Sequence, residues 1–112
     1  MKNTIDINGH KAVIAFDPEI NLFRGEFIGL NGGADFYAAT VDELHKEGKI
    51  SLNVFLDGCR EKGIEPRRSF SGRFNVRLEP EVHAAAVIAA AAEDKSLNEW
   101  VAGAIAEAAK AA

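Results

Sequence analysis

Between Arg73 and Leu78, polar and apolar residues alternate at every position. Because side chains in a β-strand point the same way every second residue, this alternation predicts a strand with one polar and one apolar face. The polar face carries Arg73, Asn75 and Arg77, and the apolar face carries Phe74, Val76 and Leu78. A lone strand leaves its backbone groups without partners, so the pattern also requires a second strand from another source.

Two helices are predicted after this strand. Pro80 suits the first position of a helix, and the alanine-rich run 84–92 favours a helix throughout. Residues 93–95 interrupt that run. Ser96 and Glu99 then form a capping box, in which each side chain bonds a backbone N–H of the other residue. The second helix carries one apolar stripe, made of Leu97, Trp100, Val101, Ala104, Ile105 and Ala108.

The first part of the chain shows the period of strands. Runs at 12–16, 22–28 and 35–38 are rich in β-formers and are separated by turn sequences, which predicts an antiparallel meander. Asn8-Gly9 precedes the first run. It fits either a hairpin turn after a further short strand or a bulge in one longer strand, and the sequence leaves both open.

A capping box at Thr40 and Glu43 predicts the start of a helix of about twenty residues. Gly63 suits its C-terminal cap, and Pro66 prevents the helix from continuing. The residues expected to face the sheet are Leu44, Leu52, Phe55, Leu56 and Cys59.

These elements predict an α+β chain in three parts. Residues 1–64 form a β-β-β-α module, residues 65–71 a linker, and residues 72–112 a strand–helix–helix unit. The last unit is too small to bury enough surface alone, because domains of about 40 residues rarely fold without help. Two copies would solve this by pairing their strands and sharing one core.

Composition narrows the classes of function. The chain has 112 residues, a formal net charge of −4 and one cysteine, so no disulfide can form within it. The three histidines lack metal-ligand spacing, and no cofactor motif is present. No apolar run is long enough for a membrane and no signal peptide is apparent, which favours a cytoplasmic protein. The charge is uneven, because residues 66–78 contain four arginines and no acid.

The strand–helix–helix order resembles the ribbon-helix-helix DNA-binding domain. A two-stranded ribbon fits the major groove, where arginine can grip guanine and asparagine can grip adenine. Arg73, Asn75 and Arg77 are therefore the predicted base contacts. The start of the last helix, at Lys95, Ser96 and Leu97, is the predicted phosphate contact. The predicted dimer core comprises Phe74, Val76, Leu78, Trp100 and Val101.

The complete order of parts resembles the HicB family of antitoxins. The matching motifs are Thr40-Val41-Asp42-Glu43-Leu44, Gly63-x-x-Pro66, Phe70-Ser71-Gly72-Arg73-Phe74, Pro80-Glu81-x-His83 and Lys95-Ser96-Leu97-Asn98-x-Trp100-Val101. The chain departs from the family at Gly48, where a bulky apolar residue is common, and at Asp94, where glycine is common. Aspartate tolerates left-handed backbone geometry, so the turn at Asp94 is expected to survive.

The HicB resemblance implies a function for each half. The N-terminal module would have the degenerate RNase H-like fold of the family and block a HicA-type toxin, which cleaves RNA. The C-terminal half would be a homodimeric ribbon-helix-helix domain that binds operator DNA and represses its own operon. A further contact through residues 1–64 would give a tetramer. The resemblance fixes no toxin-binding residues.

Two other classes of function remain. The first is a stand-alone ribbon-helix-helix repressor without a toxin partner. The second is an enzyme, because Asp17, Glu26 and Asp35 lie on or beside strands and could gather as metal ligands. Turn and surface roles explain these three carboxylates more simply, so the sequence predicts a protein without catalytic residues.

Overall fold

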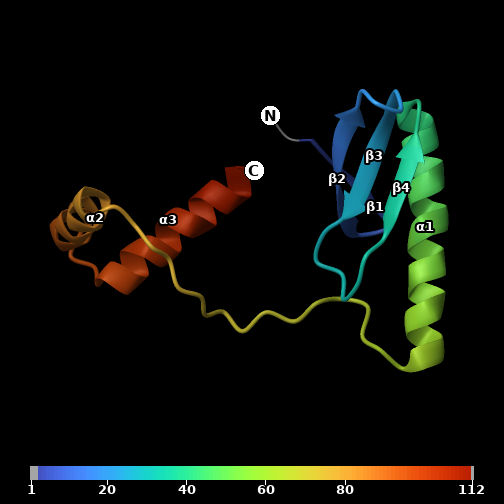
Figure 1. Cartoon of the computed structure of the whole chain (residues 1–112). Coiled ribbons are helices and arrows are strands. Elements are labelled where there is room, and N and C mark those ends of the chain that lie inside the picture. Colours follow the sequence, from blue (N-terminus) through green and yellow to red (C-terminus); the bar gives the residue numbers. More distant parts are fainter. Residues whose placement is uncertain (1–2, 112) are drawn as a thin grey trace. The chain divides into compact units, whose positions relative to one another are not determined.

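The computed structural model describes residues 3–111, with side chains up to residue 110. The chain divides into two compact units, and the boundary lies between Ser71 and Gly72. The N-terminal unit holds an antiparallel sheet and one long helix, and the C-terminal unit holds two shorter helices (Figure 1).

The sheet has four strands in the order β1-β2-β3-β4: β1 at Thr4–Ile7, β2 at His10–Asp17, β3 at Leu22–Phe27 and β4 at Asp35–Ala38. The expected β-β-β-α module is therefore a β-β-β-β-α module. Asn8 and Gly9 join β1 to β2 with φ values of 52° and 84°. Positive φ at both central residues is the signature of the tight hairpin turn that Asn-Gly favours, so the hairpin alternative is correct and the bulge is not.

Close approach to glycine shapes the core between the sheet and α1, the helix at Val41–Lys62. The ring of Phe36 lies directly over Gly25, where a Cβ atom would come within 2.2 Å of it. Ile7 approaches Gly48 of α1 just as closely, since a Cβ there would lie 2.1 Å from the Ile7 Cδ1 atom. Gly48 thus makes room for a sheet residue, which accounts for its place inside a helix despite its low helix propensity.

The Phe36–Gly25 contact gives a stability prediction. Gly25→Ala is expected to lower the free energy of unfolding by about 1–3 kcal/mol, because the ring cannot move away without disturbing the core. Gly58→Ala is the matched control, since no atom beyond its chain neighbours and the adjacent helix backbone lies within 4 Å of its Cβ position in α1, and it should add about 0.5–1 kcal/mol. Chemical denaturation followed by circular dichroism measures both. A Gly25→Ala variant as stable as Gly58→Ala would contradict this packing.

The ends of α1 follow the sequence prediction. The Thr40 hydroxyl accepts a hydrogen bond from the Glu43 N–H, and the Glu43 carboxylate accepts one from the Ala39 N–H. Gly63 ends the helix in the left-handed conformation, with φ at 67°. Leu44, Leu52 and Cys59 are buried, and Phe55 and Leu56 pack against the core, so the predicted sheet-facing side of α1 is confirmed.

The chain after α1 returns to the sheet before it leaves the N-terminal unit. The Pro66 carbonyl accepts from the Asn31 N–H, and the Arg68 N–H donates to the Gly29 carbonyl. The Arg67 guanidinium donates to the carbonyl of Gly9 in the β1–β2 turn, at 3.1 Å. Residues 66–68 of the predicted linker are therefore hydrogen-bonded to the N-terminal unit.

The C-terminal unit contains α2 at Pro80–Ala92 and α3 at Leu97–Ala111. Asp94 in the connection between them has a φ of 55°, which is the left-handed geometry expected where the resembling family has glycine. The Lys95 N–H donates back to the Ala90 carbonyl at 2.9 Å, so the turn closes the end of α2 as a Schellman-type cap. The structure thus confirms the expected start of the first helix at Pro80, the break at residues 93–95 and the start of the second helix after Ser96.

Candidate nucleic-acid interface

The segment before α2, residues 73–78, forms no strand in the single chain. Its three apolar side chains are largely exposed, with Phe74 at 72%, Val76 at 57% and Leu78 at 46%. The sequence pattern already requires a partner strand for this segment, and one copy of the chain supplies none. The strand and its inward-facing side thus remain predictions that apply to an assembly of two copies.

An apolar groove runs between this segment and α3. Its volume is about 730 Å³, and its lining includes Phe74 and Val76 on one side and Val101 and Ile105 on the other. Val101 is half-buried and Ile105 is 44% exposed. Of the five predicted core residues, Phe74, Val76 and Val101 therefore border the same open space within one unit, whereas Leu78 and Trp100 do not line it.

The C-terminal unit buries very little of its own apolar surface. Among its described residues, only Ala86 and Ala90 are buried hydrophobic side chains. Large apolar residues of α2 stay exposed: Val82 at 49%, Val87 at 46% and Ile88 at 69%. Exposed apolar surface of this extent on a small unit marks an interaction site. The sequence predicts that a second copy of the unit covers this surface, and that pairing stays a prediction.

The polar positions of the segment are also exposed. Arg73, Asn75 and Arg77 alternate with the apolar residues, and Arg73 and Asn75 also line the groove beside α3. Their chemistry suits base edges in the major groove, because guanidinium and amide groups each make paired hydrogen bonds there. All three residues are exposed, and their role as base contacts stays a prediction.

The start of α3 is a fully formed capping box. The Glu99 N–H donates to the Ser96 hydroxyl at 3.1 Å, and the Ser96 N–H donates to the Glu99 carboxylate at 3.3 Å. The backbone amide of Ser96 is thus already bonded, and a carboxylate lies beside it. Of the predicted phosphate contacts, the Leu97 amide and the Lys95 ammonium are better placed than the Ser96 amide. Lys95 also pairs with Glu93 at 3.7 Å.

Trp100 links α3 to the end of α2. Its indole N–H donates to the carboxylate of Glu93, and the side chain is half-buried in the single chain. The indole N–H is hydrogen-bonded while part of the ring remains exposed to solvent. Such a tryptophan suits a position at the edge of a protein–protein interface. Its predicted place in a dimer core remains a prediction.

The capping box carries a prediction of its own. Ser96→Ala is expected to cost about 0.5–2 kcal/mol of stability, because the Glu99 N–H loses its acceptor. Ser96→Asp should retain most of that stability, since aspartate is also a preferred cap. Thermal unfolding followed by circular dichroism compares the two variants with the parent. Equal loss in both variants would show that the cap hydrogen bond does not stabilise α3.

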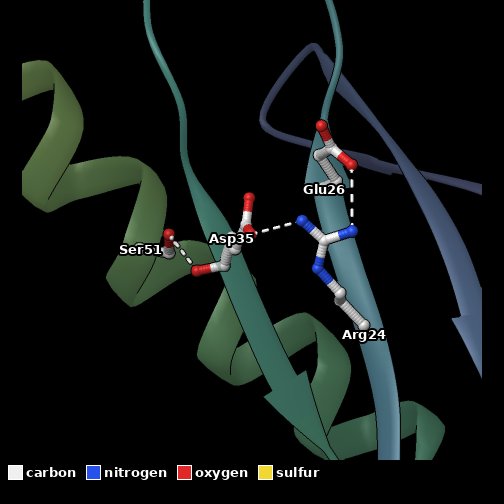
Figure 2. Close-up of polar contacts among 4 residues, drawn as sticks. All are labelled: Arg24, Glu26, Asp35 and Ser51. Carbon is white, nitrogen blue, oxygen red and sulfur yellow. Dashed lines mark hydrogen bonds and ion pairs between the residues drawn. The ribbon is translucent and has the colours of Figure 1, made fainter. Parts of the chain in front are cut away.

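The side chains of Arg24, Glu26 and Asp35 form a polar cluster on the sheet, and Ser51 of α1 contacts the backbone of the same strand β4 (Figure 2). Arg24 donates to Asp35 at 2.5 Å and to Glu26 at 3.1 Å, while the Asp35 carbonyl accepts from the Ser51 hydroxyl at 2.9 Å. The Asp35 partner is the main reason that the pKa of Arg24 lies above its ordinary value. The guanidinium thus stays charged and holds both carboxylates.

These contacts account for the carboxylates that raised the enzyme alternative. Glu26 and Asp35 share Arg24, and Asp17 accepts a hydrogen bond from the Glu19 N–H at 3.0 Å in a turn. Within the described part of the chain, no three His, Cys, Asp or Glu side chains gather as a metal site. The three carboxylates have turn and sheet-surface roles in the structure.

Sequence reasoning missed the cluster around Arg24 and the anchoring of Arg67. The pairing of Arg24 with Asp35 depends on the register of β3 and β4, which places Glu26 opposite Asp35 and Arg24 opposite Tyr37. The alternation of residues in β3 predicted which side of the sheet carries Arg24, but it could not predict that Asp35 of β4 lies beside it. Arg67 lies 58 positions from Gly9 in sequence, and no local pattern joins them.

Comparison with known proteins gives one result. The model of the HicB family matches residues 55–105, which span the end of α1, the connection between the units and most of the C-terminal unit. This match supports membership of the HicB family and is consistent with a component of a toxin–antitoxin system. No curated protein and no solved structure matched the chain. Among the described residues, no helix has the length and apolar character needed to cross a membrane.

Proposed function

We propose that this chain is an antitoxin that also represses transcription. In this proposal the N-terminal unit binds and blocks a HicA-type RNA-cleaving toxin. The C-terminal unit forms a homodimeric ribbon-helix-helix domain that recognises operator DNA. The observation that carries the proposal is the alternating segment 73–78, which leaves its apolar positions exposed in one chain and lies within the HicB match.

The DNA-binding role is supported by charge and by symmetry. Four arginines and no acid occupy residues 66–78 of an otherwise acidic chain, which favours a targeted contact over general attraction to nucleic acid. Pairing two copies of the segment would place six polar side chains on one ribbon, related by a two-fold axis. The operator is therefore expected to be an inverted repeat.

We assign the toxin-binding role to the N-terminal unit because it forms a compact unit separate from the C-terminal helices. It has its own core of nine buried residues, and it carries more acids than bases. An acidic surface complements a basic RNA-cleaving protein and steers their association. The proposal includes no catalytic role for either unit.

Co-expression with the adjacent gene product tests the division of roles. The complete chain is expected to neutralise a toxin encoded beside it, and a variant lacking residues 1–64 is expected to lose neutralisation completely. The same truncated variant should still shift operator DNA in a gel. If it still neutralises the toxin, the roles of the two units are wrong. If the complete chain binds operator but neutralises no neighbouring product, a stand-alone repressor is the correct reading.

A further inference from the structure

The outward side of α1 carries a stripe of six residues with a regular spacing. The members of this outer stripe recur alternately every four and three positions: Glu43, Glu47, Ile50, Val54, Asp57 and Glu61. Because an α-helix has 3.6 residues per turn, this spacing keeps all six on one side over the length of the helix. The buried residues of α1, among them Leu44 and Leu52, lie on a different side.

The centre of the outer stripe is apolar and open. Ile50 is 50% exposed and Val54 is 69% exposed, and both are β-branched residues, which lower helix propensity without gaining burial in this unit. Beside them runs a groove of about 500 Å³ between α1 and the start of β4, lined in part by Ala34, Phe36 and Phe55. Ile50 and Val54 line this groove themselves, together with polar residues such as Asp35 and Ser51. They form an exposed apolar surface on α1, beside β4, that a segment of a partner protein can cover (Figure 1).

Acidic residues lie on the stripe at both ends of this apolar centre, and Lys46 lies beside it, four positions before Ile50. Glu47 lines the groove itself, and Glu43 and Glu61 lie at the two ends of the stripe. Among the described residues, none of these three carboxylates pairs with a lysine or arginine, although Glu43 accepts the Ala39 N–H. Asp57 differs, because it pairs with Arg60 at 3.1 Å.

The charges indicate which partner fits. If two copies of α1 packed antiparallel along this stripe, Ile50 would face Val54, but Glu43 would face Glu61 and Glu47 would face Asp57. Parallel packing would place each acid against itself. Like charges directly opposite one another oppose association, so a second copy of this chain is a poor occupant. A partner protein that places lysine or arginine on both sides of its own apolar residues would complement this surface.

We infer that the outer stripe of α1 is the docking surface for the toxin, and that the toxin contacts it with a basic amphipathic helix. An amphipathic helix can place apolar residues three or four positions apart against an exposed apolar pair such as Ile50 and Val54, while its polar flanks meet the charges at either end. Ile50 and Val54 would fill the centre of the contact, and Glu47 and Glu61 would select the basic flanks. This inference rests on the proposed function, since it names the surface through which the N-terminal unit acts.

The test replaces the apolar centre without harming the helix. Ile50→Ala/Val54→Ala removes two exposed side chains and raises helix propensity, so the unit should remain folded by circular dichroism. Affinity of the full chain for the protein encoded by the adjacent gene, measured by calorimetry, should fall roughly 10- to 100-fold, as for central contact residues. Glu47→Lys/Glu61→Lys should weaken binding about tenfold at low salt and less at high salt.

A matched double variant tests the competing surface. Val13→Ala/Tyr37→Ala removes two exposed side chains, 42% and 45% accessible, from the sheet face that α1 does not cover, and it should leave affinity unchanged. If Ile50→Ala/Val54→Ala binds as tightly as the parent, the stripe is not the docking surface, while the proposed function stands. If the parent itself does not bind the adjacent product, the proposed function fails and the inference fails with it.

Discussion

Phe74→Ala is expected to destabilise the assembled C-terminal unit by about 3–5 kcal/mol, the cost of removing a buried phenylalanine. In a single chain Phe74 lies at the groove beside α3 and is 72% exposed. Its removal from one copy alone would therefore change the free energy of unfolding little. The large effect comes from the second copy, whose strand and helices are proposed to cover this side chain. Chemical denaturation at several protein concentrations measures the change together with its dependence on assembly.

Phe70→Ala is the matched control for Phe74→Ala. Phe70 is 71% exposed, almost the same as Phe74, but it lies outside the alternating segment and its ring is covered by the Arg68 guanidinium at 5.2 Å. Its loss is expected to cost no more than about 1 kcal/mol, the value of an exposed cation–π contact. Similar small effects at both positions would mean that Phe74 is not buried by a second copy.

The triple variant Arg73→Ala/Asn75→Ala/Arg77→Ala is expected to abolish preference for the operator. Each bidentate base contact is worth about 1–3 kcal/mol of discrimination, and each copy would lose all three. The fold should persist, because these side chains are exposed in the single chain and lie on the polar side of the predicted ribbon. Gel-shift titration on operator and scrambled duplexes at one salt concentration measures the loss.

Arg60→Ala controls for the loss of positive charge. Arg60 is an exposed arginine of α1 whose described ion pair is to Asp57, and it lies outside the arginine-rich segment. It should leave operator preference unchanged. A triple variant that is folded and still prefers the operator as the parent does would show that the polar side of the segment does not read DNA.

Local patterns predicted much of the fold. The capping boxes at Thr40 and Ser96, the C-terminal cap at Gly63 and the left-handed turn at Asp94 all follow from interactions within a few residues, and all are present. The sequence did not decide whether β1 is a separate strand, because Thr4–Ile7 has only four residues. So short an alternation fits both a hairpin at Asn8-Gly9 and a bulge in one longer strand.

Features that depend on distant neighbours were beyond the sequence. The helix propensity of Gly48 gives no sign that Ile7 fills the space beside it, and the anchoring of Arg67 to Gly9 joins positions from opposite ends of the unit. The predicted strand at 73–78 belongs to the same class, since the hydrogen-bond partner proposed for it is a second copy of the chain. One chain therefore shows the exposed apolar side of this segment but not the ribbon.

The central claim is that two copies of residues 73–78 pair as an antiparallel ribbon. Isotope-filtered nuclear Overhauser measurements on a mixture of labelled and unlabelled protein detect contacts between copies alone. We expect cross-strand contacts between the two copies throughout residues 73–78, in a particle of twice the 12.1 kDa chain mass. A folded 12.1 kDa monomer, or a dimer without contacts between these segments, would contradict it.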